Sequence, residues 1–385
     1  MAESRKFKLT AKEKQQIEED HKLDHLRQLK KEKRLNDRRL LKEYQPTAFS
    51  ALDHALKTGR ISHACLFHGP RNSMKKEMAF LLAESLLCFE ADGLADESRL
   101  SGRDEKIVQR TADGEHADLI FLDGYRKKQI FKEEVDLIQT RFSKTALEGN
   151  GRRVYIIDHA ENSSESAMNS LLKFLEEPAD GVYAILTADN LEGILPTVRS
   201  RCVLIPFRPL PKHVFMERAL AEGIDSEDAY FLSGMMAGSG SMADTAASIP
   251  YQTGKKMLKQ FLDIGEDRRL LLTDYDVRYR ARASRAQEES AESVKASEAR
   301  DVNLDILNAF FTLLMGFCRD VITCDDQGPS WYHNAVLSAS KRENSREIYG
   351  QILKIAAEER DLVNRNNDLT LLLAQALFRI EEIYD

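Results

Sequence analysis

Short runs of consecutive apolar residues, separated by stretches with helical periodicity, dominate the first half of this chain. The runs are Ala64–Phe67, Leu119–Leu122, Val154–Ile157, Tyr183–Leu186 and Val203–Ile205. Strands without polar alternation are typical of a parallel sheet that is covered on both faces. Because helical segments lie between the runs, the pattern predicts a doubly wound α/β domain.

The strand signals stop at three prolines, Pro206, Pro209 and Pro211. At 385 residues the chain is too long for one ordinary core. We therefore predict four parts: a charged leader at 1–44, helical or disordered; the α/β module at 45–210; a small helical unit at 211–265; and a larger helical domain at 266–385. The last includes a charged extension at 278–300, an exposed helix or a disordered loop. It also has an apolar helix face, formed by Leu304, Leu307, Phe310, Phe311 and Leu314.

Charge is unevenly distributed along the chain. The formal net charge is -7, which argues against a protein that coats DNA, because phosphate binding needs concentrated positive charge. Residues 1–44 nevertheless carry fourteen Lys and Arg against nine Asp and Glu. The leader is therefore interpreted either as a solvated helix or as an arm that contacts a partner or DNA.

Cysteine spacing and hydropathy restrict the class of protein further. The five cysteines include no CxxC pair, so we expect reduced, mostly buried thiols and no metal site. No run approaches the roughly eighteen uninterrupted apolar residues of a membrane helix, and the amino terminus is highly charged. We expect no membrane contact and a cytoplasmic protein.

A loop in the position of a phosphate-binding loop lies between the first strand and the next helix. Its sequence runs from Gly69 to Lys76, where the motif GxxxxGK[ST] would end on a hydroxyl. Met74 replaces the second glycine and should fill the space that phosphates need. Lys76 replaces the Ser or Thr that would hold magnesium. Lys75 matches the phosphate lysine, but without those neighbours we interpret it as a surface lysine at a helix start.

The strand Val154–Ile157 ends in Asp158, the kind of residue that positions magnesium. His159 follows it, where a hydrolytic protein needs a glutamate to activate water. Glu161 comes two residues later, and its spacing points it elsewhere. Changes at the glycine, the magnesium ligand and the base together predict a degenerate site with no bound cofactor.

Three segments resemble the bacterial delta-prime clamp-loader family of DNA polymerase III. They are His116–Leu119, Asn169–Pro178, which reads NSLLKFLEEP, and Leu195–Cys202, which reads LPTVRSRC. With the strand between them they cover most of residues 60–207. Asn364–Leu369 resembles the end of a clamp-loader collar domain more loosely. The family's four-cysteine zinc module would follow the first helix, where this chain has only Cys88.

The resemblance implies a P-loop NTPase-like AAA+ module, a helical lid at 211–265 and an all-α collar at 266–385 that holds a five-subunit ring. It implies gamma/tau-type ATPase and delta subunits as partners, with the sliding clamp and primer-template DNA reached through the complex. Arg201 would act in trans on the γ-phosphate of a neighbour's ATP, a role suited to a rigid, permanently charged guanidinium. A local salt bridge is the competing interpretation. Arg199 is interpreted as a surface residue and Cys202 as buried packing.

The resemblance implies a subunit of the DNA polymerase III holoenzyme, active in DNA replication, that has no ATPase activity of its own. Two other functions stay open. One is an active gamma-type AAA+ ATPase, which would need a working phosphate loop. The other is a non-catalytic AAA+-fold adaptor, against which only the SRC element at Ser200–Cys202 counts.

Overall fold

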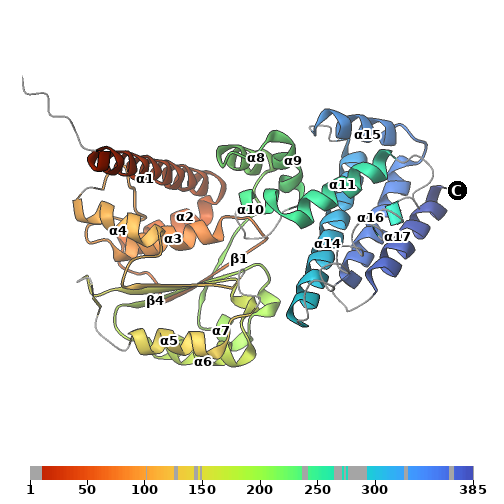
Figure 1. Ribbon diagram of the computed structural model, residues 1–385. Coiled ribbons are helices and arrows are strands. Elements are labelled where there is room, and N and C mark those ends of the chain that lie inside the picture. Colours follow the sequence, from red (N-terminus) through yellow and green to blue (C-terminus); the bar gives the residue numbers. More distant parts are fainter. Residues whose placement is uncertain are drawn as a thin grey trace, which may run out of the picture. The chain divides into compact units, whose positions relative to one another are not determined.

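The computed structural model divides the chain into two compact units, Met1–Leu210 and Pro211–Asp385 (Figure 1). It describes residues 11–100, 102–124, 129–142, 146–147, 150–235, 242–263, 271–272, 275, 293–324, 328–363 and 368–384. The predicted division into four parts stays a prediction. Of the collar-like segment at Asn364–Leu369, residues 364–367 lie outside the described residues, as do residues 278–292 of the charged extension.

The first unit is built on a five-stranded parallel sheet with the order β2-β3-β4-β1-β5. Its strands are β1 (Ala64–His68), β2 (Leu119–Asp123), β3 (Arg153–Asp158), β4 (Val182–Ala188) and β5 (Val203–Pro206). They contain the five apolar runs, and β3 is buried along its whole length. The predicted α/β fold class, a parallel sheet with helices on both faces, is confirmed.

Helices cover both faces of the sheet (Figure 1). One face carries α2 (Pro46–Lys57), α3 (Lys75–Leu87) and α4 (Gly102–Ala112), and the other carries α5 (Lys132–Phe142), α6 (Glu165–Glu176) and α7 (Pro196–Arg199). Two short 3-10 turns, η1 (Ala160–Asn162) and η2 (Leu191–Gly193), follow β3 and β4. Because β1, β3 and β4 are parallel neighbours, the loops that follow them meet at one edge of the sheet.

The described residues of the second unit form helices and the turns that connect them, with no strand. Its helices are α8 (Lys212–Ala221), α9 (Ser226–Met235), α10 (Met242–Ala247), α11 (Ile249–Asp263), α14 (Ser293–Thr323), α15 (Ser330–Ser340), α16 (Ser345–Val363) and α17 (Leu369–Tyr384). One apolar core joins residues from α8 to α17, so both predicted helical parts contribute to it. The predicted apolar face packs into this core, where Leu307, Phe310, Phe311 and Leu314 are fully buried.

Val302–Thr323 of α14 is long and apolar enough to span a membrane by length and composition alone. However, 61% of its apolar window is buried inside the protein. Phe310 and Phe311 stack at a centroid distance of 5.4 Å within the helical core. α14 is therefore apolar because it packs in the core of the helical unit.

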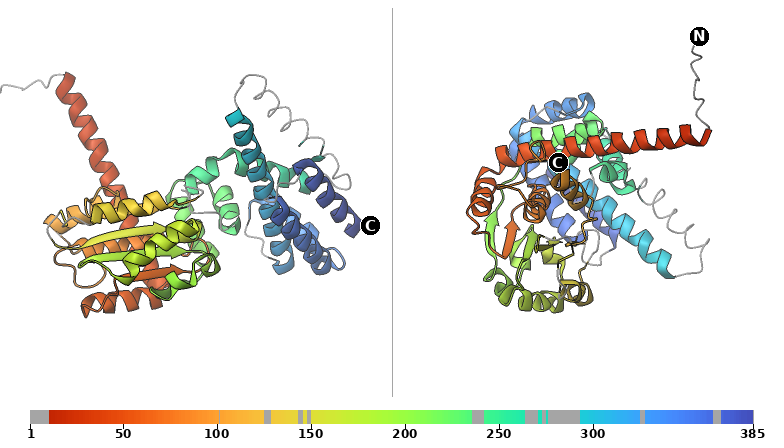
Figure 2. Two further views of the ribbon diagram at one scale, coloured as in Figure 1. Left: turned by 90° about the horizontal axis from the view of Figure 1, so that it is seen from below. Right: turned by 90° about the vertical axis from the view of Figure 1, so that its left-hand side faces the viewer.

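The leader forms one helix, α1 (Ala11–Tyr44), across its described residues. Leu40 and Leu41 are buried where α1 meets the module, and the amino-terminal part of the helix projects away from it (Figure 2). Beneath α1 lies Glu84 of α3, whose side chain is buried. Burial raises the pKa of Glu84 to about 8, although the positive charge of Arg34 opposes the shift. Glu84 therefore holds a proton at neutral pH.

This buried carboxyl predicts a specific dependence of stability on pH. Between its ordinary pKa and about 8, Glu84 binds a proton in the folded chain but not in the unfolded one. Stability should therefore fall as pH rises through that range. Glu84→Gln should flatten this dependence and make the chain more stable than wild type above pH 8, by roughly 1–3 kcal/mol. Urea denaturation followed by circular dichroism at pH 5.5 and 8.5 measures the difference. Parallel pH profiles for wild type and Glu84→Gln would contradict the prediction, and exposed Glu90→Gln is the control.

Candidate functional site

The loop between β1 and α3 has the backbone shape of a tight phosphate-binding turn but carries unusual side chains. A Cβ added to Gly69 would collide with the carbonyl of Phe207, so this position requires glycine. Asn72 and Met74 adopt left-handed backbone angles, with φ of 56° and 65°. Met74 caps the amino end of α3 with its side chain buried to 1% exposure. The methionine side chain is buried at the start of α3, and its exclusion of phosphates stays a prediction.

Lys75 is buried, so its interpretation as a surface lysine is wrong. Its side chain is 6% exposed because the ammonium turns back onto its own loop. Nζ donates to the carbonyl oxygens of Gly69 at 2.9 Å and Pro70 at 2.7 Å. It also lies 2.9 Å from Oδ1 of Asp189, which follows β4. Ser73 Oγ is a fourth neighbour at 3.2 Å, so the three donors of the ammonium are fully engaged within the chain.

Lys76 places a second positive charge at the ends of β2 and β3. Its Nζ lies 3.4 Å from Oδ2 of Asp123 and 3.6 Å from Oδ2 of Asp158. The same ammonium lies 4.7 Å from the ring centroid of Phe121. A cation of this chain therefore lies within 3.6 Å of both carboxylates.

Asp158 is held in place by a buried hydroxyl. Thr187 Oγ1 donates to Asp158 Oδ1 at 2.6 Å and accepts from the backbone N–H of His159 at 3.0 Å. Burial raises the pKa of Asp158, while the Lys76 charge and the Thr187 hydrogen bond oppose that shift. Asp158 therefore depends on nearby positive charge to remain ionised.

His159 joins a cluster of carboxylates instead of facing solvent. Its backbone is left-handed, with φ of 52°, and its Nδ1 lies 3.5 Å from Glu161 Oε1 and 3.6 Å from Asp189 Oδ2. Burial lowers the pKa of His159, but the hydrogen bond to Glu161 and the charges of Asp158, Asp189 and Glu161 outweigh burial and raise it. The prediction that Glu161 points elsewhere is wrong, because the left-handed turn at His159 brings it back.

His159, Glu161 and Asp189 place possible ligand atoms within 4.8 Å of one another, a spacing that a metal ion could bridge. Cations of the chain already contact this cluster, however. Asp189 pairs with Lys75 at 2.9 Å and with Arg71 Nε at 3.0 Å. The cluster is therefore a network in which cations of the chain face the carboxylates, and the expectation of no metal stays a prediction.

Arg201 lies away from this network, near the amino ends of the strands. It precedes β5, in which Val203 pairs with Cys65 near the start of β1. Nη2 lies 2.5 Å from Oε1 of Glu176, and Nη1 donates to the carbonyl of Thr197 at 2.9 Å. The Arg201 side chain is 34% exposed and that of Glu176 49%. In the isolated chain the guanidinium therefore makes a local, solvent-accessible salt bridge.

Cys202, the residue after Arg201, is less buried than the sequence predicts. Cys202 is half-buried, not fully buried, because it lies at the margin of the sheet core and only partly packs against it. Its thiol pKa is raised to about 12 by burial, so it stays protonated. Arg199 is also half-buried, and its interpretation as a surface residue stays a prediction.

Several residues of the network are not among those singled out from the sequence. They are Arg71, Asp123, Thr187, Asp189 and, beside Arg201, Glu176. A signal for two of them exists: Thr187 is polar in an otherwise apolar strand, and Asp189 is an acid directly after that strand. The pairing of Arg201 with Glu176 joins two motifs far apart in sequence, so only the fold reveals it.

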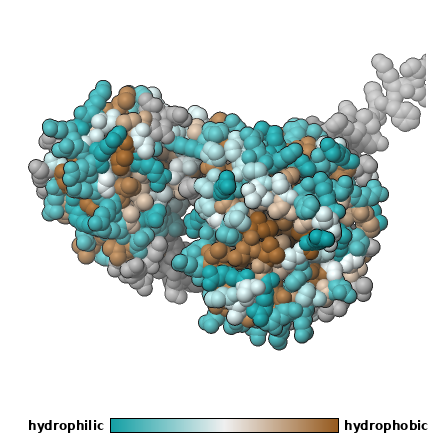
Figure 3. Space-filling model, turned by 180° about the vertical axis from the view of Figure 1, so that it is seen from behind, coloured by the Kyte–Doolittle hydropathy of each residue, from teal (hydrophilic) through white to brown (hydrophobic). Residues whose placement is uncertain are grey.

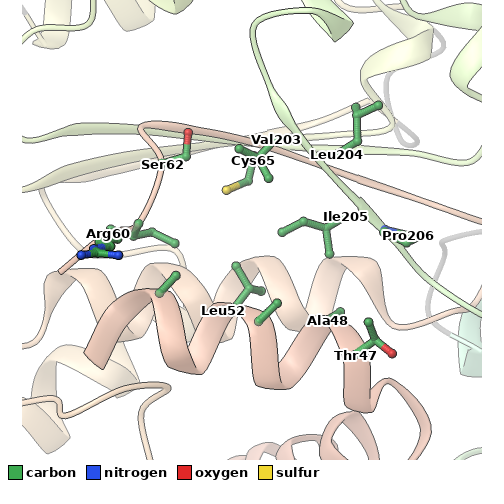
Figure 4. A pocket seen from close by; sticks show the side chains of 13 residues that line it. Thr47, Ala48, Leu52, Arg60, Ser62, Cys65, Val203, Leu204, Ile205 and Pro206 are labelled. Atoms are coloured by element: carbon green, nitrogen blue, oxygen red, sulfur yellow. The ribbon is translucent and has the colours of Figure 1, made fainter. Parts of the chain in front are cut away.

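An apolar cavity of about 240 Å³ lies elsewhere in the first unit, between α2 and β5 (Figure 4). Its lining includes Ala48, Leu52, Cys65, Leu204 and Ile205, with Arg60 at one end. Val203 and Leu204 are 49% and 43% exposed on this edge strand. A space-filling view from behind shows an apolar patch within the hydrophilic surface of the first unit (Figure 3). The cavity shares no residue with the loop at Gly69–Lys76.

Comparison with known proteins relates the first unit to clamp-loader subunits. A family model described as "DNA polymerase III, delta subunit" matches residues 44–211. The delta' subunit of Bacillus subtilis DNA polymerase III is 34% identical over 197 residues, which cover 51% of this chain and 57% of that protein. The delta' subunit of Pseudomonas aeruginosa is 31% identical over 205 residues, or 52% and 60% of the two chains.

A gamma/tau subunit of DNA polymerase III from Mycobacterium tuberculosis is also similar, with 31% identity over 222 residues, 54% of this chain and 37% of that protein. The chain thus matches between about a third and three fifths of the length of these relatives. Among solved structures, a gamma subunit-related protein of Thermotoga maritima is 16% identical with a TM-score of 0.38, covering 88% of this chain and 100% of that one. A score this low adds no argument.

The position of Lys76 predicts an energetic coupling. Lys76→Met should lower the free energy of unfolding by about 1 kcal/mol, because Asp123 and Asp158 then face each other without a cation. In an Asp158→Asn background the same substitution should cost less. Urea denaturation of the two single variants and the double variant gives the coupling energy. Strict additivity would contradict the pairing, and exposed Lys173→Met on α6 is the matched control.

Proposed function

The module at residues 44–211 belongs to the family described as DNA polymerase III, delta subunit, and from this premise we propose that the chain is a delta-prime-like clamp-loader subunit. It acts as a non-hydrolysing stator during the loading of sliding clamps in DNA replication. It supplies Arg201 to the ATP site of a neighbouring subunit.

The observation that carries the proposal is the ammonium of Lys76 between Asp123 and Asp158. A magnesium ion that enters with ATP would have to displace this cation and would find no Ser or Thr hydroxyl to bind. The buried Lys75 ammonium supports the same conclusion, because it would have to break its bonds to the loop carbonyls before it reached a phosphate.

His159 supports the absence of hydrolysis. It stands where a water-activating carboxylate is needed, and its raised pKa favours the protonated, acidic form. A protonated imidazole cannot accept a proton from water. Glu161 is near, but its Oε1 already accepts the backbone N–H of Asp189 at 2.8 Å.

Arg201 supports a role in trans by its accessibility. A salt bridge between two solvent-exposed groups contributes at most about 1 kcal/mol, so Arg201 can leave Glu176 at little cost. A γ-phosphate offers more negative charge than one carboxylate and suits the planar guanidinium. The proposed partners are therefore gamma/tau-type ATPase and delta subunits, with clamp and primer-template DNA engaged through the complex, in the cytoplasm.

An active gamma-type ATPase is the second candidate, because the M. tuberculosis gamma/tau subunit is 31% identical to this chain. The contacts of Lys75 and Lys76 at the loop after β1 disfavour an active ATPase, because nucleotide and magnesium would have to break them. Nucleotide binding by the isolated chain distinguishes the two candidates.

We predict that the isolated full-length chain does not bind ATP with a micromolar Kd in the presence of magnesium. The physical reason is that magnesium-ATP would have to break the bonds of Lys75 to the loop carbonyls and separate Lys76 from Asp123 and Asp158. Isothermal titration calorimetry measures this directly, and a micromolar Kd would favour the gamma-type candidate. As a matched variant, Met74→Gly with Lys76→Thr restores the missing glycine and hydroxyl and should bind magnesium-ATP more tightly than wild type.

We predict that Arg201→Ala leaves folding and ring assembly intact but lowers the DNA-stimulated ATPase of a reconstituted clamp loader. An arginine that acts on transferring phosphate contributes about 10³–10⁵ in turnover at its own site, so the share of that site should disappear. Glu176→Gln releases Arg201 without removing it and should retain the ATPase. Arg199→Ala is the matched control. Unchanged ATPase and clamp loading in Arg201→Ala would favour a non-catalytic adaptor.

A further inference from the structure

Charged contacts join the leader helix to a part of the first unit that is distant in sequence. We call the participating face of α1 the basic edge; it consists of Lys30, Lys31, Arg34 and Arg38. We call the surface opposite it the acidic ridge; it consists of Asp96, Glu97, Glu105 and Asp113. Because the basic residues are spaced by one, three and four positions, they lie along one side of the helix.

The pairs follow the helix in order. Lys30 Nζ lies 2.7 Å from Asp113, and Lys31 Nζ lies 2.6 Å from Glu105. One turn further, Arg34 binds Glu97 through two hydrogen bonds of 2.7 and 2.9 Å. At the next turn, Arg38 Nε donates to the carbonyl of Ala95 at 2.8 Å, and its Nη1 lies 3.7 Å from Asp96.

The pairs differ in their exposure to solvent. Arg34 and Glu97 are 17% and 6% exposed, whereas Lys30 and Asp113 are 56% and 23% exposed. Lys31 and Glu105 are also accessible, at 30% and 43%. Salt therefore screens the two outer lysine pairs far more than the inner arginine pair.

Apolar burial does little to hold this stretch of α1. The first fully buried apolar side chain in the described part of the helix is Leu40. Before it, Leu26 and Leu29 are 54% and 48% exposed. The acidic ridge, by contrast, is anchored from behind, because Leu94, Ile107 and Val108 are buried in the module. Charge therefore decides whether residues 25–38 of α1 dock.

We propose that the acidic ridge is a docking surface for a basic helix, occupied in this structure by the chain's own leader, which docks and undocks under the control of ionic strength. The inner pair at Arg34 and the buried Leu40 and Leu41 form the fixed end. The outer pairs at Lys30 and Lys31 release first, and their release uncovers Glu105 and Asp113 and frees the projecting part of α1 (Figure 2). This inference is independent of the proposed role in a clamp loader.

Hydrogen exchange of the full-length chain, read on peptides from residues 25–38, tests the proposal. Raising NaCl from about 50 to about 500 mM should speed exchange there about fivefold or more and leave α3 unchanged. The double variant Lys30→Glu with Lys31→Glu should exchange as fast at low salt as wild type does at high salt. Salt-independent exchange of wild type would overturn the proposal.

A charge swap separates docking from helix propensity. Glu105→Lys with Asp113→Lys should undock the leader alone, and combining it with the Lys30→Glu and Lys31→Glu changes should restore protection at low salt. Arg39→Glu is the matched control, because Arg39 is 62% exposed and its hydrogen-bonded and ionic partners are Asn36 and Glu43 of the same helix. Two outcomes would show that docking does not depend on these pairs. One is that Arg39→Glu exchanges as fast as the variant with Lys30→Glu and Lys31→Glu. The other is that the variant with all four substitutions does not recover protection.

Discussion

Two lysine–aspartate contacts at one edge of the sheet organise the first unit. Lys75 reaches Asp189 after β4, and Lys76 reaches Asp158 at the end of β3. The parallel register makes both contacts possible, because it places the ends of β1, β3 and β4 side by side. Asp158 is 2% exposed, and a carboxylate so deeply buried requires compensating charge. Lys76 supplies that charge at Asp158 from within the chain, and Lys75 does the same at Asp189.

The separation of Arg201 from this network is equally a consequence of the sheet. The loop network follows the carboxyl ends of β1, β3 and β4, whereas Arg201 precedes the start of β5. A side chain at the amino edge cannot serve the loop at the carboxyl edge of its own sheet. If Arg201 acts on a triphosphate, the triphosphate is therefore held by another subunit, which is the geometry that the proposed function requires.

The strands and their parallel arrangement follow from local pattern, since they depend on apolar runs. The substitutions at Met74 and Lys76 are visible in a short motif, but the contacts that these two side chains make are not. The predictions from sequence are wrong where a side chain turns back over its own loop, as at Lys75, or where the backbone reverses direction, as before Glu161. Lys75 is buried by carbonyls five and six positions before it. Glu161 returns to the site through the left-handed backbone of His159, an angle that histidine adopts only rarely. Pairs such as Arg34 with Glu97, 63 residues apart, leave no local signal.

At position 76 the phosphate-loop motif has a Ser or Thr hydroxyl, and this chain has a lysine. The lysine adds a positive charge as well as removing the hydroxyl. A simple deletion of the hydroxyl at position 76 would leave Asp123 and Asp158 facing each other with no ion to separate them. Their repulsion and the buried charge of Asp158 would then weaken the contact between β2 and β3. Lys76 places a positive charge beside both carboxylates from within the chain. The ends of β2 and β3 are therefore balanced by a side chain of the same chain.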